Sequence, residues 1–133
     1  MSEHACSTSE AFDRRARLAL DLAVAGDLPG AQAAAQELDL YHGALTGALL
    51  VWVDTLIGRT EPAQQQALLT PPETTDPATR WAAEVIAARL TLNKQAFVDL
   101  RLAVPRTRAG VDEHATALLC LIADHLNPHG GPA

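Results

Sequence analysis

The sequence predicts an all-α fold, with six or seven helices in successive antiparallel hairpins that form either a short solenoid or a bundle. Alanine is the commonest of the 133 residues, and aromatic residues make up only 4%. Because alanine has the highest helix propensity, whereas strands are rich in β-branched and aromatic residues, this composition favours helices. One helical domain is expected over residues 10–127, between a flexible tail at 1–9 and a disordered tail at 128–133.

The first two helices are marked by capping residues. Ser7 and Glu10 have the spacing of a capping box, which predicts that the first helix begins there. Gly26 is expected to end this helix in the left-handed conformation. Asp27 then caps a second helix, which tolerates Pro29 in its first turn.

Glycine, proline and capping residues mark the other helices in the same way. Gly58 is expected to end the third helix, Thr60 to cap the fourth and Asp76 to cap the fifth. Asn93 turns the chain into the sixth helix, and Pro105 ends it. These later helices are expected over residues 41–57, 61–69, 76–92, 94–104 and 110–126.

The turn between the first two helices has counterparts further along the chain. Three alanines follow these turns with spacings of 32 and 33 residues: Ala31, Ala63 and Ala96. Gly26 precedes the first of them by the same interval as Gly58 precedes the second. In this spacing the segment 12–104 resembles the tetratricopeptide repeat, a helical hairpin with a period in the low thirties. The third turn departs from that pattern, because Thr91 stands where the family has glycine.

The two tryptophans are candidates for a partner-binding face. In the register of the resemblance, Trp52 and Trp81 lie on the inner faces of first helices, with Val85 and Arg89 nearby. In tetratricopeptide proteins an extended peptide or a partner helix docks on that concave face, and Trp beside Arg is typical of interface hot spots. The alternative is that both indoles belong to the core.

Asp54 is a carboxylate in the most hydrophobic predicted helix. At helical spacing it shares a face with Gly43 and Gly47, which predicts a close helix contact nearby. A carboxylate in such a place is either a ligand anchor or general base with a raised pKa, or the partner of an arginine on a neighbouring helix.

The sequence contains no recognisable metal or catalytic motif. His114 and His125 share a helical face but lie about 16 Å apart, too far to bind one metal ion. Pro128 breaks the helix between His125 and His129, and His42 stands alone. With no nucleophile motif and no Gly-rich phosphate loop either, we predict no catalytic residue, no metal site and no cofactor.

Charge and hydropathy exclude two further classes of partner. The net charge of −6 argues against nucleic acid. Three arginines form a local basic cluster, but acidic residues flank it, which favours a solvated surface of mixed charge. The cluster is Arg101, Arg106 and Arg108, and the acids are Asp99, Asp112 and Glu113. The apolar run 45–58 is too short to cross a bilayer, and no signal peptide is present, so we expect a cytoplasmic protein without membrane contact.

The last predicted helix is strongly apolar and suggests self-association. Its apolar side chains form one stripe with a residue on either flank: Val111, Ala115, Leu118 and Ile122, flanked by Leu119 and Leu121. If one monomer covers only part of this helix, a homodimer would bury the rest. The alternative is that the helix lies in the concave groove against Trp52 and Trp81.

These observations favour a non-catalytic helical interaction module, an adaptor or regulator that binds a protein partner or itself. The alternative is a small-molecule-binding or enzymatic helical bundle with its site near Asp54, Trp52 and Trp81.

Overall fold

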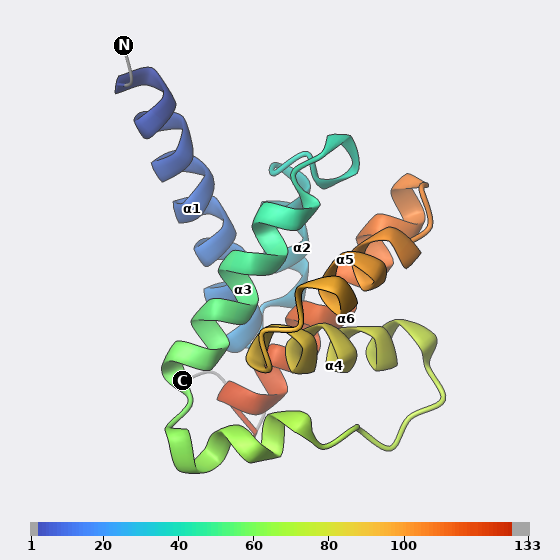
Figure 1. Cartoon of the computed structure of the whole chain (residues 1–133). Helices are drawn as coiled ribbons and strands as arrows, with labels where there is room; N and C mark the ends of the chain where they lie inside the picture. The colour runs from blue at the N-terminus through green and yellow to red at the C-terminus, as the bar shows by residue number, and fades with distance from the viewer. Residues whose placement is uncertain (1–2, 129–133) are drawn as a thin grey trace.

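A computed structural model describes residues 3–128 and confirms the all-α class. Within that range it contains six α-helices and two 3-10 helices and no strand (Figure 1). The elements in chain order are α1 (Glu3–Val24), α2 (Leu28–Gln36), η1 (Leu40–His42), α3 (Leu45–Arg59), η2 (Pro62–Leu69), α4 (Pro77–Leu90), α5 (Lys94–Ala103) and α6 (Arg108–Leu126).

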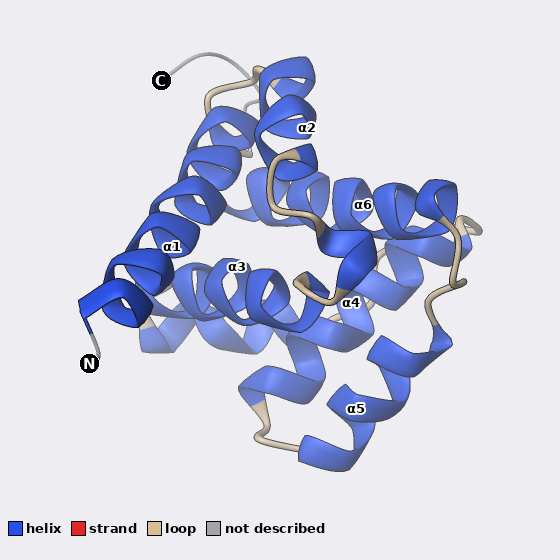
Figure 2. Ribbon diagram, turned by 90° about the horizontal axis from the view of Figure 1, so that it is seen from above, coloured by secondary structure: helices blue, strands red, loops and turns tan. Residues whose placement is uncertain are grey.

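The last helix occupies the middle of the molecule. α6 contacts α1, α2, α3, α4 and η1, so the first and last helices of the chain lie against each other (Figure 2). In a linear solenoid each repeat contacts only its neighbours in sequence. The helices therefore form a bundle around α6, whereas α5 packs on α4 at the edge.

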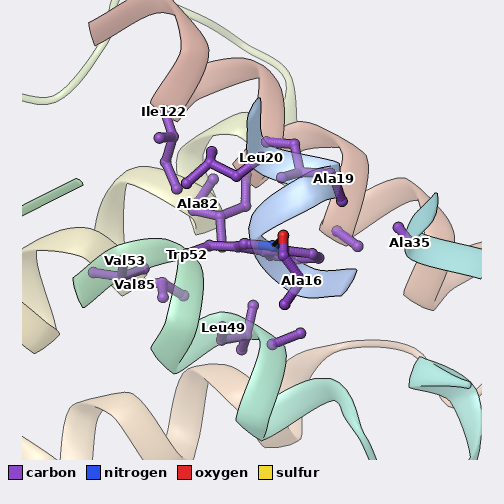
Figure 3. Packing of buried hydrophobic residues seen from close by; sticks show 14 of the residues in the cluster. Ala16, Ala19, Leu20, Ala35, Leu49, Trp52, Val53, Ala82, Val85 and Ile122 are labelled. Carbon is purple, nitrogen blue, oxygen red and sulfur yellow. Dashed lines mark hydrogen bonds between the residues drawn. The ribbon is translucent and has the colours of Figure 1, made fainter. Parts of the chain in front are cut away.

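The core is built from alanine, leucine and the two tryptophans. Trp52 lies between α1 and the neighbouring helices, beside Ala16, Leu20 and Ala82 (Figure 3). Its indole N–H donates a hydrogen bond of 2.8 Å to the carbonyl oxygen of Ala16. Alanines on α1 and α2, among them the fully buried Ala31, let these two helices approach closely.

The apolar stripe of α6 is covered within the chain. Every residue of the stripe and both flanking leucines are buried: Val111, Ala115, Leu118, Leu119, Leu121 and Ile122. In the structure α6 packs against α1, α2, α3, α4 and η1. The surface on which the predicted homodimer depended is therefore not exposed.

Three predicted helix starts are confirmed by their capping hydrogen bonds. The side chains of Asp27, Asp76 and Asn93 each accept a hydrogen bond from the backbone N–H three residues later, at 3.0 to 3.1 Å. A side-chain oxygen at this position satisfies a backbone donor that has no partner inside the helix. A loop with the adjacent prolines Pro71 and Pro72 connects η2 to α4.

The predicted start of the first helix at Ser7 is wrong, because α1 already begins at Glu3. Residues 3–9 have helical backbone, although the sequence predicted a tail there. Serine and threonine inside a helix cost only about half a kcal/mol each relative to alanine, so an established helix extends through them. The predicted tail from 129 onward lies outside the described residues.

The boundaries of α3 also differ from the prediction. The helix begins at Leu45 rather than at Tyr41, because Gly43 adopts a left-handed φ of 118° and interrupts the chain after η1. At the other end Gly58 stays inside the helix. Thr60 was predicted to cap the next helix, η2, but this prediction is wrong. Its hydroxyl instead donates a hydrogen bond back to the carbonyl of Leu56.

The first turn does recur, but 66 residues later. The residue equivalent to Gly26 is Leu92, not Thr91 as predicted. At Gly26 the following N–H of Asp27 bonds to the carbonyl of Leu22, the pattern of a Schellman motif. The same pattern surrounds Leu92, whose φ is 57°, and a side-chain cap follows both turns. Ala63, the predicted middle counterpart of Ala31, is exposed in η2.

Candidate functional site

The predicted partner face around the tryptophans is closed. Trp52, Trp81 and Val85 are buried in the core, so their side chains have no face left for a partner. The indole N–H of Trp81 donates to the carbonyl oxygen of Leu100 at 2.7 Å, which ties α5 to α4. Because they are buried, Trp52, Trp81 and Val85 do not form an exposed binding face as the sequence predicted. The alternative that both indoles belong to the core is the one observed.

Asp54 and Arg89 form an ion pair with each other. The Arg89 Nε and Nη2 atoms donate to the two carboxylate oxygens of Asp54 at 2.7 and 3.0 Å. The Asp54 side chain is about half exposed, at 49%. The hydrogen bonding that Arg89 donates to the Asp54 carboxylate raises the pKa of the Arg89 guanidinium. The predicted site near Asp54 is therefore a surface ion pair between α3 and α4 rather than a ligand anchor facing a cavity.

The other candidates for a metal ligand or a nucleophile include His114 and Cys120, both on α6. Among residues 10–128, whose side chains the structure describes, no three His, Cys, Asp or Glu side chains gather as metal ligands would. His114 packs edge-on against Trp81, with its Nδ1 within hydrogen-bonding distance of the Gly110 carbonyl. Burial and the nearby Asp124 raise the pKa of the Cys120 thiol, which disfavours the reactive thiolate.

An open pocket of about 380 Å³ lies where η1, α5 and the start of α6 meet. Its volume is within the range of small-ligand sites. We call it the Tyr41 pocket, and it is lined by Leu40, Tyr41, Gly43, Leu45, Arg101, Leu102, Val104, Pro105, Arg106 and Val111. Apolar side chains form most of the lining, and arginines supply its charge.

A strained turn presents Tyr41 at this pocket. Two left-handed residues, Asp39 at φ 56° and Gly43 at φ 118°, bracket η1. The Tyr41 side chain between them is 42% exposed. The guanidinium of Arg108 lies 5.3 Å from the centre of its ring, within the range of a cation–π contact, and His42 packs against it edge-on. The tyrosine is therefore held in place from two sides while remaining accessible.

The connection before α6 carries two of the arginines. Thr107 caps α6 by accepting a hydrogen bond of 2.9 Å from the N–H of Gly110. A side chain at Gly110 would come within 2.7 Å of Pro105, so only glycine fits this corner. Arg106 and Arg108 flank Thr107, and both are exposed. The cap at Thr107 was not predicted from the sequence, although a threonine shortly before the apolar run of the last helix was a signal for it.

The predicted basic cluster lies at this pocket, and among the described residues its three arginines have no carboxylate partner. Arg101 and Arg106 line the pocket, and Arg108 stacks on Tyr41, which also lines it. Arg101 is anchored by donating a hydrogen bond to the hydroxyl of Thr46. Among the described residues, the ion pairs are formed by His42, Arg59 and Arg89 and by none of these three arginines. Asp99, which was expected to flank the cluster, instead accepts from Gln95.

α5 continues the exposed surface beyond the pocket. None of its ten residues is buried, and Val98 and Leu102 are exposed one helical turn apart. Leu102 lines the Tyr41 pocket, so the apolar face of α5 runs into it. We call Tyr41, Val98 and Leu102 together the α5 face.

The sequence contained the arginine cluster but not its convergence with Tyr41. About sixty residues separate Tyr41 from Arg101, and only the packing of η1 beside the end of α5 brings them together. Two signals were available: Tyr41 is the only tyrosine of the chain, and Gly43 follows it closely.

The fold and this surface define the chain as an all-α bundle with an exposed apolar face and a basic pocket. No helix in the described range has the length and apolar character needed to cross a bilayer. Comparison with protein-family models, curated proteins and solved structures found no match.

Proposed function

We propose that the chain is a non-catalytic helical module that binds a protein partner through the α5 face. The supporting observation is that large apolar side chains are exposed together there. The described chain has five exposed large apolar side chains: Leu18, Tyr41, Leu92, Val98 and Leu102. Three of these make up the α5 face, and Leu92 begins the turn that leads into α5. Contiguous exposed apolar side chains are typical of interaction surfaces.

The backbone at Leu92 supports the same proposal. Leu92 has a left-handed φ of 57°, and its side chain is 75% exposed. This conformation costs a non-glycine residue about 1–2 kcal/mol, and an exposed leucine regains little of that from packing. Gly26 occupies the equivalent position of the first turn, where no such strain arises. A leucine at this place is better explained by contact with a partner than by the stability of the turn.

The common turn also supports a proposal about the architecture. α1 with α2 and α4 with α5 are joined by the same Schellman turn followed by a side-chain cap. We interpret the two pairs as two copies of one antiparallel helical hairpin, in keeping with the tetratricopeptide resemblance. Such hairpin modules present surfaces to protein partners. Self-association stays a proposal as well, and with α6 covered it would have to use a face such as that of α5.

Site-specific crosslinking tests the proposed function. Val98 is replaced by p-benzoylphenylalanine, and the protein is irradiated in its native host. The same replacement at Gln36, an exposed residue of α2, serves as the position control. We expect one protein adduct from position 98 that is absent from position 36.

A substitution pair then shows whether the adduct depends on the α5 face. Leu102→Asp should abolish the adduct, because it places a carboxylate at the centre of the contact. Leu18→Asp is the matched control, since Leu18 is a leucine of similar exposure, 51% against 54%, on α1. Loss of the adduct in both variants, or in neither, contradicts the proposal. An adduct at twice the mass of the chain would identify the partner as a second copy.

A further inference from the structure

From the contents of the Tyr41 pocket we infer that it recognises an acidic peptide segment, with one large apolar side chain entering the pocket and neighbouring carboxylates on Arg106 and Arg108. This inference rests on the proposed function, because it specifies the chemistry of the partner at one end of the α5 face.

The charge of the pocket selects an acidic partner. The chain as a whole is acidic, with a net charge of −6, yet Arg101 and Arg106 line this pocket and Arg108 stacks on its Tyr41. Among residues 10–128, whose side chains are described, none of the three has a carboxylate partner. Arginine donates in a planar fork that matches a carboxylate, and such charge-assisted bonds are stronger than neutral ones. An anionic group is therefore the complementary occupant of this rim.

The apolar lining of the pocket favours a partner that carries an apolar side chain beside its anionic groups. The apolar wall of the pocket consists of the buried Leu40, Leu45 and Val111 together with Leu102, which is 54% exposed. A free phosphate would leave this wall in contact with water. A peptide that carries a Trp, Phe or Leu next to its acidic residues would cover the wall and satisfy the arginines at the same time.

Arg101, Arg108 and Tyr41 have contacts within the chain before any partner binds. Thr46 anchors Arg101, the ring of Tyr41 supports Arg108, and the Thr107 cap fixes the segment between Arg106 and Arg108. Side chains that are already restrained lose less conformational freedom on binding. The overall negative charge disfavours long polyanions such as nucleic acid, whereas a short acidic segment interacts mainly with the local field of the pocket.

Fluorescence anisotropy with defined peptides tests this inference. The probe is a fluorescein-labelled hexapeptide in which a central tryptophan is surrounded by glutamates. One control peptide replaces the tryptophan by glycine, and a second replaces the glutamates by glutamine. We expect saturable binding of the probe, with both controls weaker by about tenfold or more because each lacks one of the two recognition elements.

Charge-reversal variants locate the binding. Arg106→Glu should weaken binding of the probe by about tenfold or more, since it removes a cation of the rim and adds a like charge. Arg14→Glu makes the same change in net charge at an exposed arginine of α1 and should weaken it by less than about threefold. Backbone amide shifts in a ¹H–¹⁵N spectrum should change in residues 40–45 and 101–111. Circular dichroism verifies that both variants remain folded.

Four outcomes overturn the inference. They are absence of saturable binding, equal loss in Arg14→Glu and Arg106→Glu, displacement of the probe by inorganic phosphate at matched ionic strength, and binding to phosphatidylserine vesicles that Arg106→Glu abolishes. The last two would assign the pocket to free phosphate or to a membrane surface. An adduct at position 98 that depends on Leu102 but not on Arg106 would leave the proposed function intact and refute the peptide assignment alone.

Discussion

The recurring turn allows a reciprocal substitution whose outcome can be worked out from the structure. Gly26 and Leu92 occupy the same position of two Schellman turns, with φ values of 90° and 57°. We predict that Leu92→Gly stabilises the protein and that Gly26→Leu destabilises it. The sign follows from the backbone, because only glycine adopts a positive φ without a steric penalty.

The magnitude is the balance of two opposing terms. Removing the side chain at Leu92 relieves about 1–2 kcal/mol of left-handed strain. The glycine also gives the unfolded chain more freedom, which offsets about 0.4–1 kcal/mol of that gain. Because the Leu92 side chain is 75% exposed, it contributes little packing that could be lost. The net expectation is a gain of about 0.5–1 kcal/mol, with Gly26→Leu losing a similar amount or more.

Urea denaturation followed by circular dichroism measures both effects as changes in the free energy of unfolding. Leu18→Gly is the control, because Leu18 is an exposed leucine inside α1 and glycine there should cost about 1 kcal/mol. A lower free energy of unfolding for Leu92→Gly, or an unchanged one for Gly26→Leu, would refute the assignment of the two turns to one geometry.

Three further predictions concern packing, surface charge and pH. Ala31→Leu should lower the free energy of unfolding by about 1–3 kcal/mol in urea titrations, since Ala31 is fully buried between α1 and α2 and has no room for a larger side chain. Asp54→Asn should lower it by no more than about 1 kcal/mol, because the Asp54 side chain of the pair with Arg89 is about half exposed; a larger loss would mean that the pair contributes more than a surface ion pair does. Hydrogen bonds from Thr79 lower the pKa of Asp76, so its contribution to stability is present above the unfolded pKa of about 4 and is lost as pH falls through the lower folded value. The urea midpoint should therefore fall less between pH 6 and pH 3 in Asp76→Asn than in the parent protein.

Local signals in the sequence were sufficient for the helix class and for several boundaries. Asp27, Asp76 and Asn93 were predictable as caps, because a cap needs only its own side chain and a backbone N–H three residues later. Gly58 was not predictable as a helical residue. A glycine inside a helix costs only about 1 kcal/mol, which the burial of neighbouring residues such as Leu56 outweighs.

The candidate site was less predictable, because it depends on contacts between distant segments. The pattern around Trp52 and Trp81 is the same for a core residue and for an inward-facing groove residue, and only the position of α6 distinguishes the two cases. The arginine cluster was visible in the sequence, but the absence of acidic partners for it among the described residues and its meeting with Tyr41 are consequences of tertiary packing.

The surface proposed for partner binding lies on the least anchored helix of the bundle. α5 has no buried residue and is attached to α4 by the hydrogen bond from Trp81 and by half-buried side chains such as Phe97 and Leu100. Segments with few buried contacts open locally at a lower free energy than the core does. The arginine end is restrained differently, through Thr46 on α3 and the cap of α6. In the proposed binding mode, the pocket at the arginine end would fix the register of an acidic segment, and the less anchored α5 would adjust to the rest of the partner.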